Sequence, residues 1–224
     1  MNERFRRFVT VAAPLVLAIV LVAHPRGESH HHTMMDNPLL WLGLHVALLP
    51  LFGLLTLSVM ALTRGLAGAA AVASRAFAGI FVVSYTAMDA VAGVASGVLA
   101  VRAQDLAPNE QRLVAEQVNA FTTDFTAPLD GAGGPVTLIT MAGGVSWGLA
   151  VVLAAVALRR GGHASTGAFI LMLAGAPFFV HDAPIAPVAL GALALGAALV
   201  HRRAIANSAQ SAAEVDGARA TPST

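Results

Sequence analysis

The sequence predicts an all-helical, polytopic integral membrane protein with six transmembrane helices and both termini in the cytoplasm. Its composition is 57% hydrophobic and only 11% charged, which leaves too little polar surface to cover a folded globule in water. Six long apolar runs alternate with polar segments, as expected for a chain that crosses a bilayer repeatedly. The arginines are concentrated in alternate segments, which is typical of multi-pass proteins of the cell membrane.

The first expected helix, residues 8–23, follows the basic start Asn2 to Arg7 and would also suit a signal peptide. Leu21 stands where cleavage before His24 would require a small residue, so we expect the helix to be retained. The next three runs, 39–62, 76–101 and 135–158, each exceed the roughly 20 residues that cross a bilayer core. We therefore expect four full crossings up to residue 158.

The last two apolar runs, 167–180 and 184–200, are shorter and are joined only by His181, Asp182 and Ala183. They have two interpretations, a re-entrant hairpin or two full crossings. Arg202 and Arg203 directly after the second run match a cytoplasmic exit, so the sequence favours two crossings.

Arginine placement sets the predicted orientation. Three arginines, Arg26, Arg102 and Arg112, fall in the segments expected outside, and the other ten fall inside: Arg4, Arg6, Arg7, Arg64, Arg75, Arg159, Arg160, Arg202, Arg203 and Arg219. The positive-inside rule then places both termini in the cytoplasm. The chain has no cysteine and a net charge of +1, so nothing indicates a disulfide framework or a nucleic-acid partner, and the lipid bilayer is the expected partner.

Two segments outside the predicted spans also have a predicted structure. Residues 108–125 carry Val114, Val118, Phe121 and Phe125 at helical spacing, which predicts an interfacial helix that serves as an anchor or as a lid over a site. Beyond the transmembrane domain of residues 1–203, the Ala-, Ser- and Thr-rich tail 204–224 has no periodicity and is expected to be disordered.

Asp89 is the candidate functional residue that stands out, because an ionisable side chain inside an apolar run requires a partner. Gly93 and Gly97 follow at steps of four residues, so a neighbouring helix can approach closely at that level. Tyr85 and Ser96 extend the same face into a polar stripe. The alternatives for Asp89 are a packing hydrogen bond, a metal ligand, a general base or a proton relay.

Three expected helices bring histidines to the outer face. His24 closes the first helix, His45 lies about two turns inside the second, and His181 with Asp182 closes the fifth. Imidazole and carboxylate suit zinc, and catalytic zinc commonly has three protein ligands and one open position. We therefore predict His24, His45 and His181 as metal ligands, with Asp89 and Asp182 as catalytic residues.

These residues favour a zinc-dependent hydrolase that acts on a lipid or another membrane-proximal substrate. The residue types are similar to those of the seven-helix membrane hydrolases of the alkaline ceramidase type, which use several His, an Asp and a Ser at a zinc site. Only the residue types correspond, and no residue is carried over. The alternatives are a non-catalytic scaffold or interaction protein, a haem or copper protein with His45 and His181 as axial ligands, and a small proton-coupled transporter that uses Asp89.

Two further patterns have a structural and a functional interpretation. His30, His31 and His32, with Met34 and Met35, would suit copper or zinc if the loop is irregular, or form an exposed polar loop. Glycines 143, 144 and 148 around Trp147 predict a close helix crossing.

Overall fold

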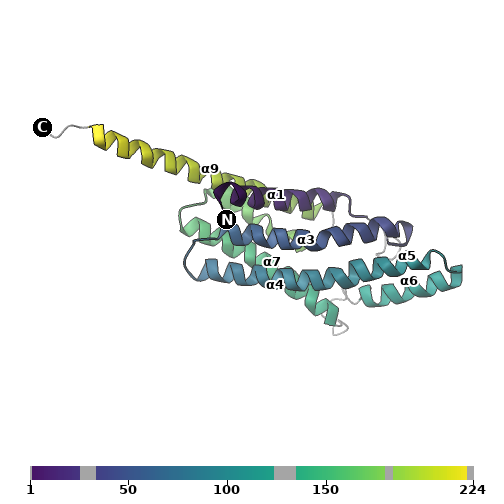
Figure 1. The fold of residues 1–224 in the computed structure, drawn as a ribbon. Coiled ribbons are helices and arrows are strands. Elements are labelled where there is room, and N and C mark those ends of the chain that lie inside the picture. The colour runs from purple at the N-terminus through teal and green to yellow at the C-terminus, as the bar shows by residue number, and fades with distance from the viewer. Residues whose placement is uncertain (1, 26–33, 124–134, 180–183, 221–224) are drawn as a thin grey trace.

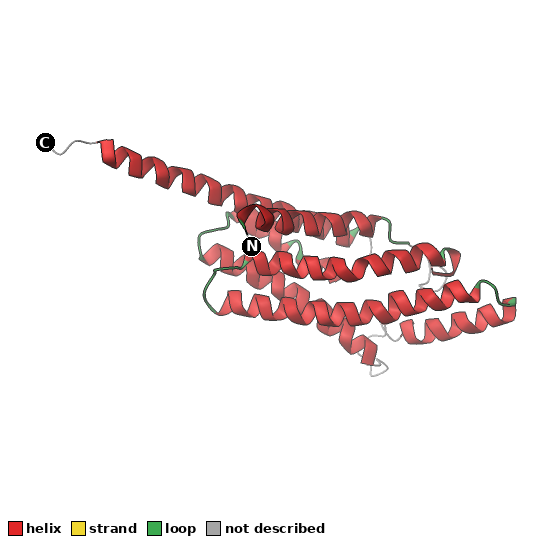
Figure 2. Cartoon of the chain, in the orientation of Figure 1, coloured by secondary structure: helices red, strands yellow, loops and turns green. Residues whose placement is uncertain are grey.

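The computed structural model describes residues 2–25, 34–123, 135–179 and 184–220, and every regular element in these ranges is a helix. The helices lie side by side in an elongated bundle (Figures 1 and 2). Five helices among the described residues are long and apolar enough to cross a membrane: Glu3–Val22, Pro38–Leu62, Ala69–Ala103, Leu138–Arg160 and Ile185–Ser208. The predicted class, a multi-pass helical membrane protein, is confirmed at this level.

The first two spans begin with side-chain caps. Helix α1 (Glu3–Val22) starts after Asn2, whose side chain accepts a hydrogen bond from the amide of Phe5, 2.8 Å away. Helix α3 (Pro38–Leu62) starts after Asn37, whose side chain accepts from the amide of Leu40 at 3.2 Å. Each cap satisfies one of the amides that a helix start leaves without a partner, so both start points are set by the local sequence.

The third span is longer than a bilayer requires. Helix α4 (Ala69–Asp89), a π-helix (Ala90–Ala95) and helix α5 (Ser96–Ala103) form one rod of 35 residues. At 1.5 Å per residue the rod is about 52 Å long, whereas the hydrocarbon core is about 30 Å thick. Its far end therefore extends beyond the core, and helix α6 (Pro108–Thr123) folds back beside α5 there (Figure 1).

Helix α6 confirms the predicted helix after the third span, but its stripe packs against protein. Val118 is 1% exposed and lies with Val114 in a small apolar cluster that contains Met34, Trp41 and Ala100. The side chain of Phe121, and Phe125 altogether, lie outside the described residues. Part of the apolar face of α6 therefore packs against the bundle.

The fifth expected crossing, 167–180, is not a continuous spanning helix. Helix α8 (Thr166–Leu173) is followed by a 3₁₀ helix (Ala176–Phe179), and eight α-helical residues rise only about 12 Å. The cause is Pro177, which lacks an amide and disfavours helix in the preceding residue. The described residues thus provide five candidate spans where the sequence predicted six, and the second of the last two runs is one of the five.

Trp147 stabilises this break from the neighbouring helix. It lies in helix α7 (Pro135–Arg160), and its indole Nε1–H donates to the carbonyl of Gly175 at 3.0 Å. That carbonyl has no continuing α-helix to supply a donor. Gly143, in the same helix, confirms the predicted close crossing, because a Cβ there would lie 2.6 Å from Cδ2 of Tyr85. Gly148 has nothing within 4 Å and takes no part in the crossing.

The last helix continues where the sequence predicted disorder. Helix α9 runs from Ile185 to Ala220, and Figure 1 shows its second half projecting from the bundle. The segment after Ala204 contains many alanines, and alanine has the highest helix propensity. Extending an existing helix also avoids the cost of a new nucleus, which explains why the tail is helical without an apolar stripe.

An aromatic cluster fills the middle of the bundle. The rings of Phe52, Phe81, Tyr85, Trp147 and Phe178 have centroid separations of 4.9 to 6.1 Å. Tyr85 was expected to extend a polar stripe from Asp89, but its ring contacts Phe52, Phe81 and Phe178 instead.

The arginine-rich segments meet at one end of the bundle, as their alternation predicted. One cavity there is lined by Arg6, Arg64, His163 and His201, which come from α1, the α3–α4 turn, the α7–α8 turn and α9. Arg160 and Gly65 line a second cavity beside it. We call this the basic end, and we call the opposite end, which holds His24, His45 and Asp89, the distal end.

Candidate functional site

The distal end gathers two imidazoles and one indole. Trp41 and His45 are four residues apart on α3 and therefore share a face, while His24 follows directly after the end of α1. The His24 ring lies 5.4 Å from the His45 ring and 5.6 Å from the Trp41 ring, and the Trp41 and His45 rings are 4.2 Å apart, all between centroids. His24 and His45 are 6% and 3% exposed, so the predicted meeting of these two histidines is observed.

Backbone carbonyls fix the orientation of both imidazoles. Nδ1 of His45 lies 2.8 Å from the carbonyl oxygen of Trp41, and Nδ1 of His24 lies 3.0 Å from that of Pro25. A carbonyl only accepts a hydrogen bond, so Nδ1 carries the proton in each ring. In the neutral state of either ring, Nε2 then bears the lone pair, which is the arrangement found in histidines that bind metals.

Asp89 is next to His45. Its Oδ1 lies 3.8 Å from Nε2 of His45, and the two side chains are 5% and 4% exposed. A separation of 3.8 Å is too long for a hydrogen bond, but it is close to the roughly 3.3 Å between two ligand atoms of a tetrahedral zinc with bonds of about 2.0 Å. Oδ2 is buried and has no hydrogen-bond partner among the described residues. The sequence predicted that Asp89 requires a partner, and the ionisable side chain beside it is His45.

Two glycines leave the space that the side chains of His45 and Trp41 occupy. A Cβ at Gly93 would lie 2.7 Å from Cβ of His45 and closer still to its ring, and a Cβ at Gly97 would lie 3.0 Å from Cδ1 of Trp41. The prediction that these glycines allow a close helix approach is confirmed. The indole Nε1–H of Trp41 donates to the carbonyl of Gly93 at 3.0 Å, so the same residues also join the two helices by a hydrogen bond.

The contact occurs at the π-helix that follows Asp89. Side chains add hydrogen bonds to the carbonyls of this segment, beside the backbone bond that Gly93 accepts from the amide of Ser96. The indole N–H of Trp41 donates to the carbonyl of Gly93, and the hydroxyl of Ser96 donates to the carbonyls of Ala92 and Gly93. π-bulges occur frequently at functional sites, which makes this segment part of the candidate site.

Sequence reasoning missed two components of this arrangement. The role of Trp41 could have been predicted from its four-residue spacing from His45, which places both side chains on one face of the helix. The π-helix has no comparable signal, because Ala90 to Ala95 are compatible with an ordinary α-helix by composition. Its presence depends on the contacts that α3 makes.

Other predicted site residues do not join the cluster in the described part of the chain. His181 and Asp182 lie outside the described residues, as do His30, His31 and His32. Met34 is completely buried beside Trp41 and Val118. Within the described ranges, no group of three or more His, Asp or Glu residues has the spacing of a metal site. His24, His45 and Asp89 form a partial donor set.

The cluster lies about one bilayer thickness from the basic end. His45 precedes the end of α3 at Leu62 by 17 residues (62 − 45), which is about 26 Å at 1.5 Å per residue. His24 follows Arg7 by the same number of residues (24 − 7). Because the hydrocarbon core is about 30 Å thick, a bilayer whose surface coincides with the basic end has its other surface near the cluster.

Comparison with known proteins identifies no relative. No protein-family model matches the chain, and no curated protein or solved structure matches it.

Proposed function

We propose that this multi-pass membrane protein is a zinc-dependent hydrolase that acts on a lipid or another membrane-proximal substrate at the distal end. The observation that carries the proposal is the arrangement of His45: a backbone carbonyl holds its Nδ1–H at 2.8 Å, and its Nε2 faces Asp89 Oδ1 at 3.8 Å. Such a fixed imidazole with a carboxylate beside its Nε2 suits a divalent metal ion.

The donor chemistry fits zinc better than other common metals. Zinc accepts imidazole nitrogen and carboxylate oxygen, whereas calcium and magnesium prefer oxygen ligands only. We assign His24 and His45 as ligands and propose His181 as the third ligand, from its sequence position at the end of the fifth apolar run. Three histidines would leave one coordination position for water, as catalytic zinc sites require.

The residues of the chain have separate roles in this proposal. A bound zinc ion would lower the pKa of a coordinated water to about 7 and so supply a nucleophile. The carbonyl of Trp41 orients His45, and with a metal bound Asp89 would be placed to take a proton from a water beside His45, with Asp182 proposed from the sequence as a second carboxylate. Burial of the cluster by Trp41 and α6 excludes bulk water, which strengthens the electrostatic interactions there.

The position of the cluster supports a lipid or membrane-proximal substrate. It lies about 26 Å from the basic end by the helical rise, at the depth of the opposite membrane surface. Apolar side chains remain exposed on the part of the molecule beyond this level, namely Val98, Leu99, Leu106 and Leu113. By the positive-inside rule the basic end faces the cytoplasm, so we propose that the substrate is reached from the outer leaflet.

Metal analysis and a visible absorption spectrum of the purified full chain test the proposal. We expect about one zinc per chain and no Soret band. His45→Ala should lower zinc affinity at least tenfold, while His163→Ala at the basic end should leave zinc content unchanged. Hydrolysis of ester- and amide-linked lipids should be lost with the zinc. A Soret band would instead indicate a haem protein, and full zinc retention in both His24→Ala and His45→Ala would reject the assigned site.

A proton-coupled transporter is the second candidate. It is favoured by the buried Oδ2 of Asp89, which has no hydrogen-bond partner among the described residues and lies inside a candidate span beside the π-helix. Intramembrane carboxyl groups of this kind commonly serve proton relays. In that case the metal-free protein would move protons across vesicle membranes, and Asp89→Asn would abolish the movement.

A further inference from the structure

A second site candidate lies at the basic end, about 26 Å from the first. It is a cavity of about 180 Å³ lined by Arg6, Arg64, His163, His201 and six mostly aliphatic residues: Ala61, Leu62, Leu66, Leu158, Val200 and Ala204. Pockets that enclose a whole drug-sized molecule usually measure roughly 300 to 1,000 Å³. This cavity therefore suits part of a molecule, such as a headgroup.

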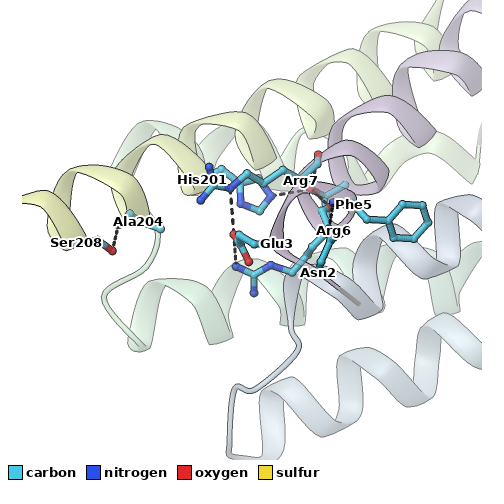
Figure 3. A network of polar contacts seen from close by, with 9 residues as sticks. Asn2, Glu3, Phe5, Arg6, Arg7, His201, Ala204 and Ser208 are labelled. Carbon is cyan, nitrogen blue, oxygen red and sulfur yellow. Dashed lines mark hydrogen bonds and ion pairs between the residues drawn. The ribbon is translucent and has the colours of Figure 1, made fainter.

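The cationic side chains of the cavity are incompletely neutralised. Glu3 forms ion pairs with Arg6 at 2.8 Å and with Arg7 at 3.0 Å, so a single carboxylate serves two guanidinium groups (Figure 3). Nε of Arg6 is buried and has no hydrogen-bond acceptor among the described residues. Arg64 forms no ion pair within the same ranges. The cavity thus has donors for an additional anion.

The wall of the cavity on the α9 side is held by hydrogen bonds. His201 is 7% exposed, and its Nε2 lies 2.7 Å from the hydroxyl of Thr10 on α1. The hydroxyl of Ser58 on α3 donates to the carbonyl of Thr10 at 3.2 Å. These bonds tie α1, α3 and α9 together beside Arg6, and Figure 3 shows His201 next to the start of α1. The part of the cavity wall next to Arg6 is therefore held in place by hydrogen bonds between three helices.

We propose that this cavity binds the phosphodiester headgroup of an anionic phospholipid. Guanidinium groups match phosphate oxygens with two parallel hydrogen bonds, and Arg6 approaches from α1 while Arg64 approaches from the α3–α4 turn. The aliphatic lining by Leu62, Leu66 and Val200 suits the glycerol and first acyl carbons next to a headgroup. Basic pockets between transmembrane helices at a membrane surface have this chemistry. The site is independent of the proposed metal site.

Lipid titration of the purified full-length protein in detergent, followed by native mass spectrometry, tests this inference. Three probes are titrated separately: phosphatidylglycerol, phosphatidylcholine and inorganic phosphate. We expect phosphatidylglycerol to bind at least about tenfold more tightly than either of the other two. Equal binding of the two lipids would overturn the proposal, and phosphate that binds as tightly as phosphatidylglycerol would identify the ligand as a free anion.

A pair of matched double variants locates the site. Each cationic residue near the membrane surface contributes about fivefold in affinity, so Arg6→Gln with Arg64→Gln should weaken phosphatidylglycerol binding about 25-fold. Arg4→Gln with Arg203→Gln removes the same charge from exposed positions outside the cavity and should weaken it less than about threefold. Equal losses in both pairs would show diffuse surface attraction and refute the cavity.

Two further measurements keep the result interpretable. If the Arg6 and Arg64 double variant does not fold, Arg64→Gln alone should weaken binding about fivefold, since Arg64 is exposed and its loss removes no ion pair found in the described residues. Zinc content should be the same in all arginine variants and in the unmodified protein. A change in lipid affinity without a change in zinc content separates this site from the proposed metal site.

Discussion

Gly93→Ala is the sharpest test of the close contact between α3 and the π-helix. The new Cβ would lie 2.7 Å from Cβ of His45 and closer to the imidazole, so one of the two helices must move. Overpacking of this kind costs about 1 to 3 kcal/mol, and replacing a helical glycine by alanine returns at most about 1 kcal/mol. We expect a net loss of about 1 to 2 kcal/mol in the free energy of unfolding.

Thermal unfolding of the purified protein in detergent measures this loss. For a chain of this size 1 kcal/mol corresponds to about 2 to 4 °C in Tm, so Gly93→Ala should lower Tm by about 2 to 8 °C. Gly148→Ala is the matched control, because it also places a methyl group in the middle of a membrane helix but has nothing within 4 Å. Its Tm should stay unchanged or rise by up to about 4 °C.

Gly93→Ala should therefore lower Tm, whereas Gly148→Ala should not. If Gly93→Ala is as stable as Gly148→Ala, the imidazole of His45 does not press on the π-helix, and the geometry argued for the site is wrong. If His45 is displaced as expected, Gly93→Ala should also reduce zinc binding, because Nε2 of His45 moves relative to the second assigned ligand, His24. Zinc binding of Gly148→Ala should remain at the level of the unmodified protein.

Four other substitutions test hydrogen bonds that join the helices. Trp147→Phe leaves the Gly175 carbonyl without its indole donor, which should cost about 1 to 3 kcal/mol and increase amide hydrogen exchange around the 3₁₀ helix; unchanged exchange would contradict the role given to Trp147. Ser74→Ala removes a 2.7 Å bond to the Ala150 carbonyl and should cost about 0.6 kcal/mol, measured by Tm, whereas Thr56→Val removes a bond of only 3.5 Å and should cost less. Thr10→Val removes the partner of His201 and should lower the free energy of unfolding by about 0.6 to 1.7 kcal/mol; a neutral effect in a denaturation titration would argue against that bond.

The fold was predictable where it depends on properties summed over many residues. Apolar composition over some 20 residues located the long spans, and the arginine alternation placed their ends together. The full crossing predicted for the fifth run, 167–180, was not confirmed. Mean hydropathy over a run does not detect a single residue such as Pro177, which interrupts a helix whatever its neighbours are. The tail after Ala204 was expected to be disordered because it has no apolar periodicity, but it is helical as far as Ala220. Alanine favours a helix even without such periodicity.

The candidate site was predictable only as far as local spacing extends. The steps of four residues from Asp89 to Gly93 and Gly97 predicted a face open to another helix, and His45 from α3 occupies it. Trp41 could have been included on its spacing alone. The positions of His181 and Asp182 remain predictions, because they depend on a turn that no periodicity describes.

The π-helix explains how one straight face of α3 contacts residues that an ideal α-helix would separate. At about 100° per residue, the eight residues from Asp89 to Gly97 would turn about 800°, which places Gly97 about 80° away from Asp89 around the axis. A π-turn accommodates one extra residue and removes about 100° of this rotation, which leaves about 20°. Trp41 and His45 are themselves only about 40° apart on α3, so they reach Gly97 and Asp89 together. The bond from Trp41 Nε1–H to the Gly93 carbonyl then stabilises the same helix irregularity that brings Asp89 to His45.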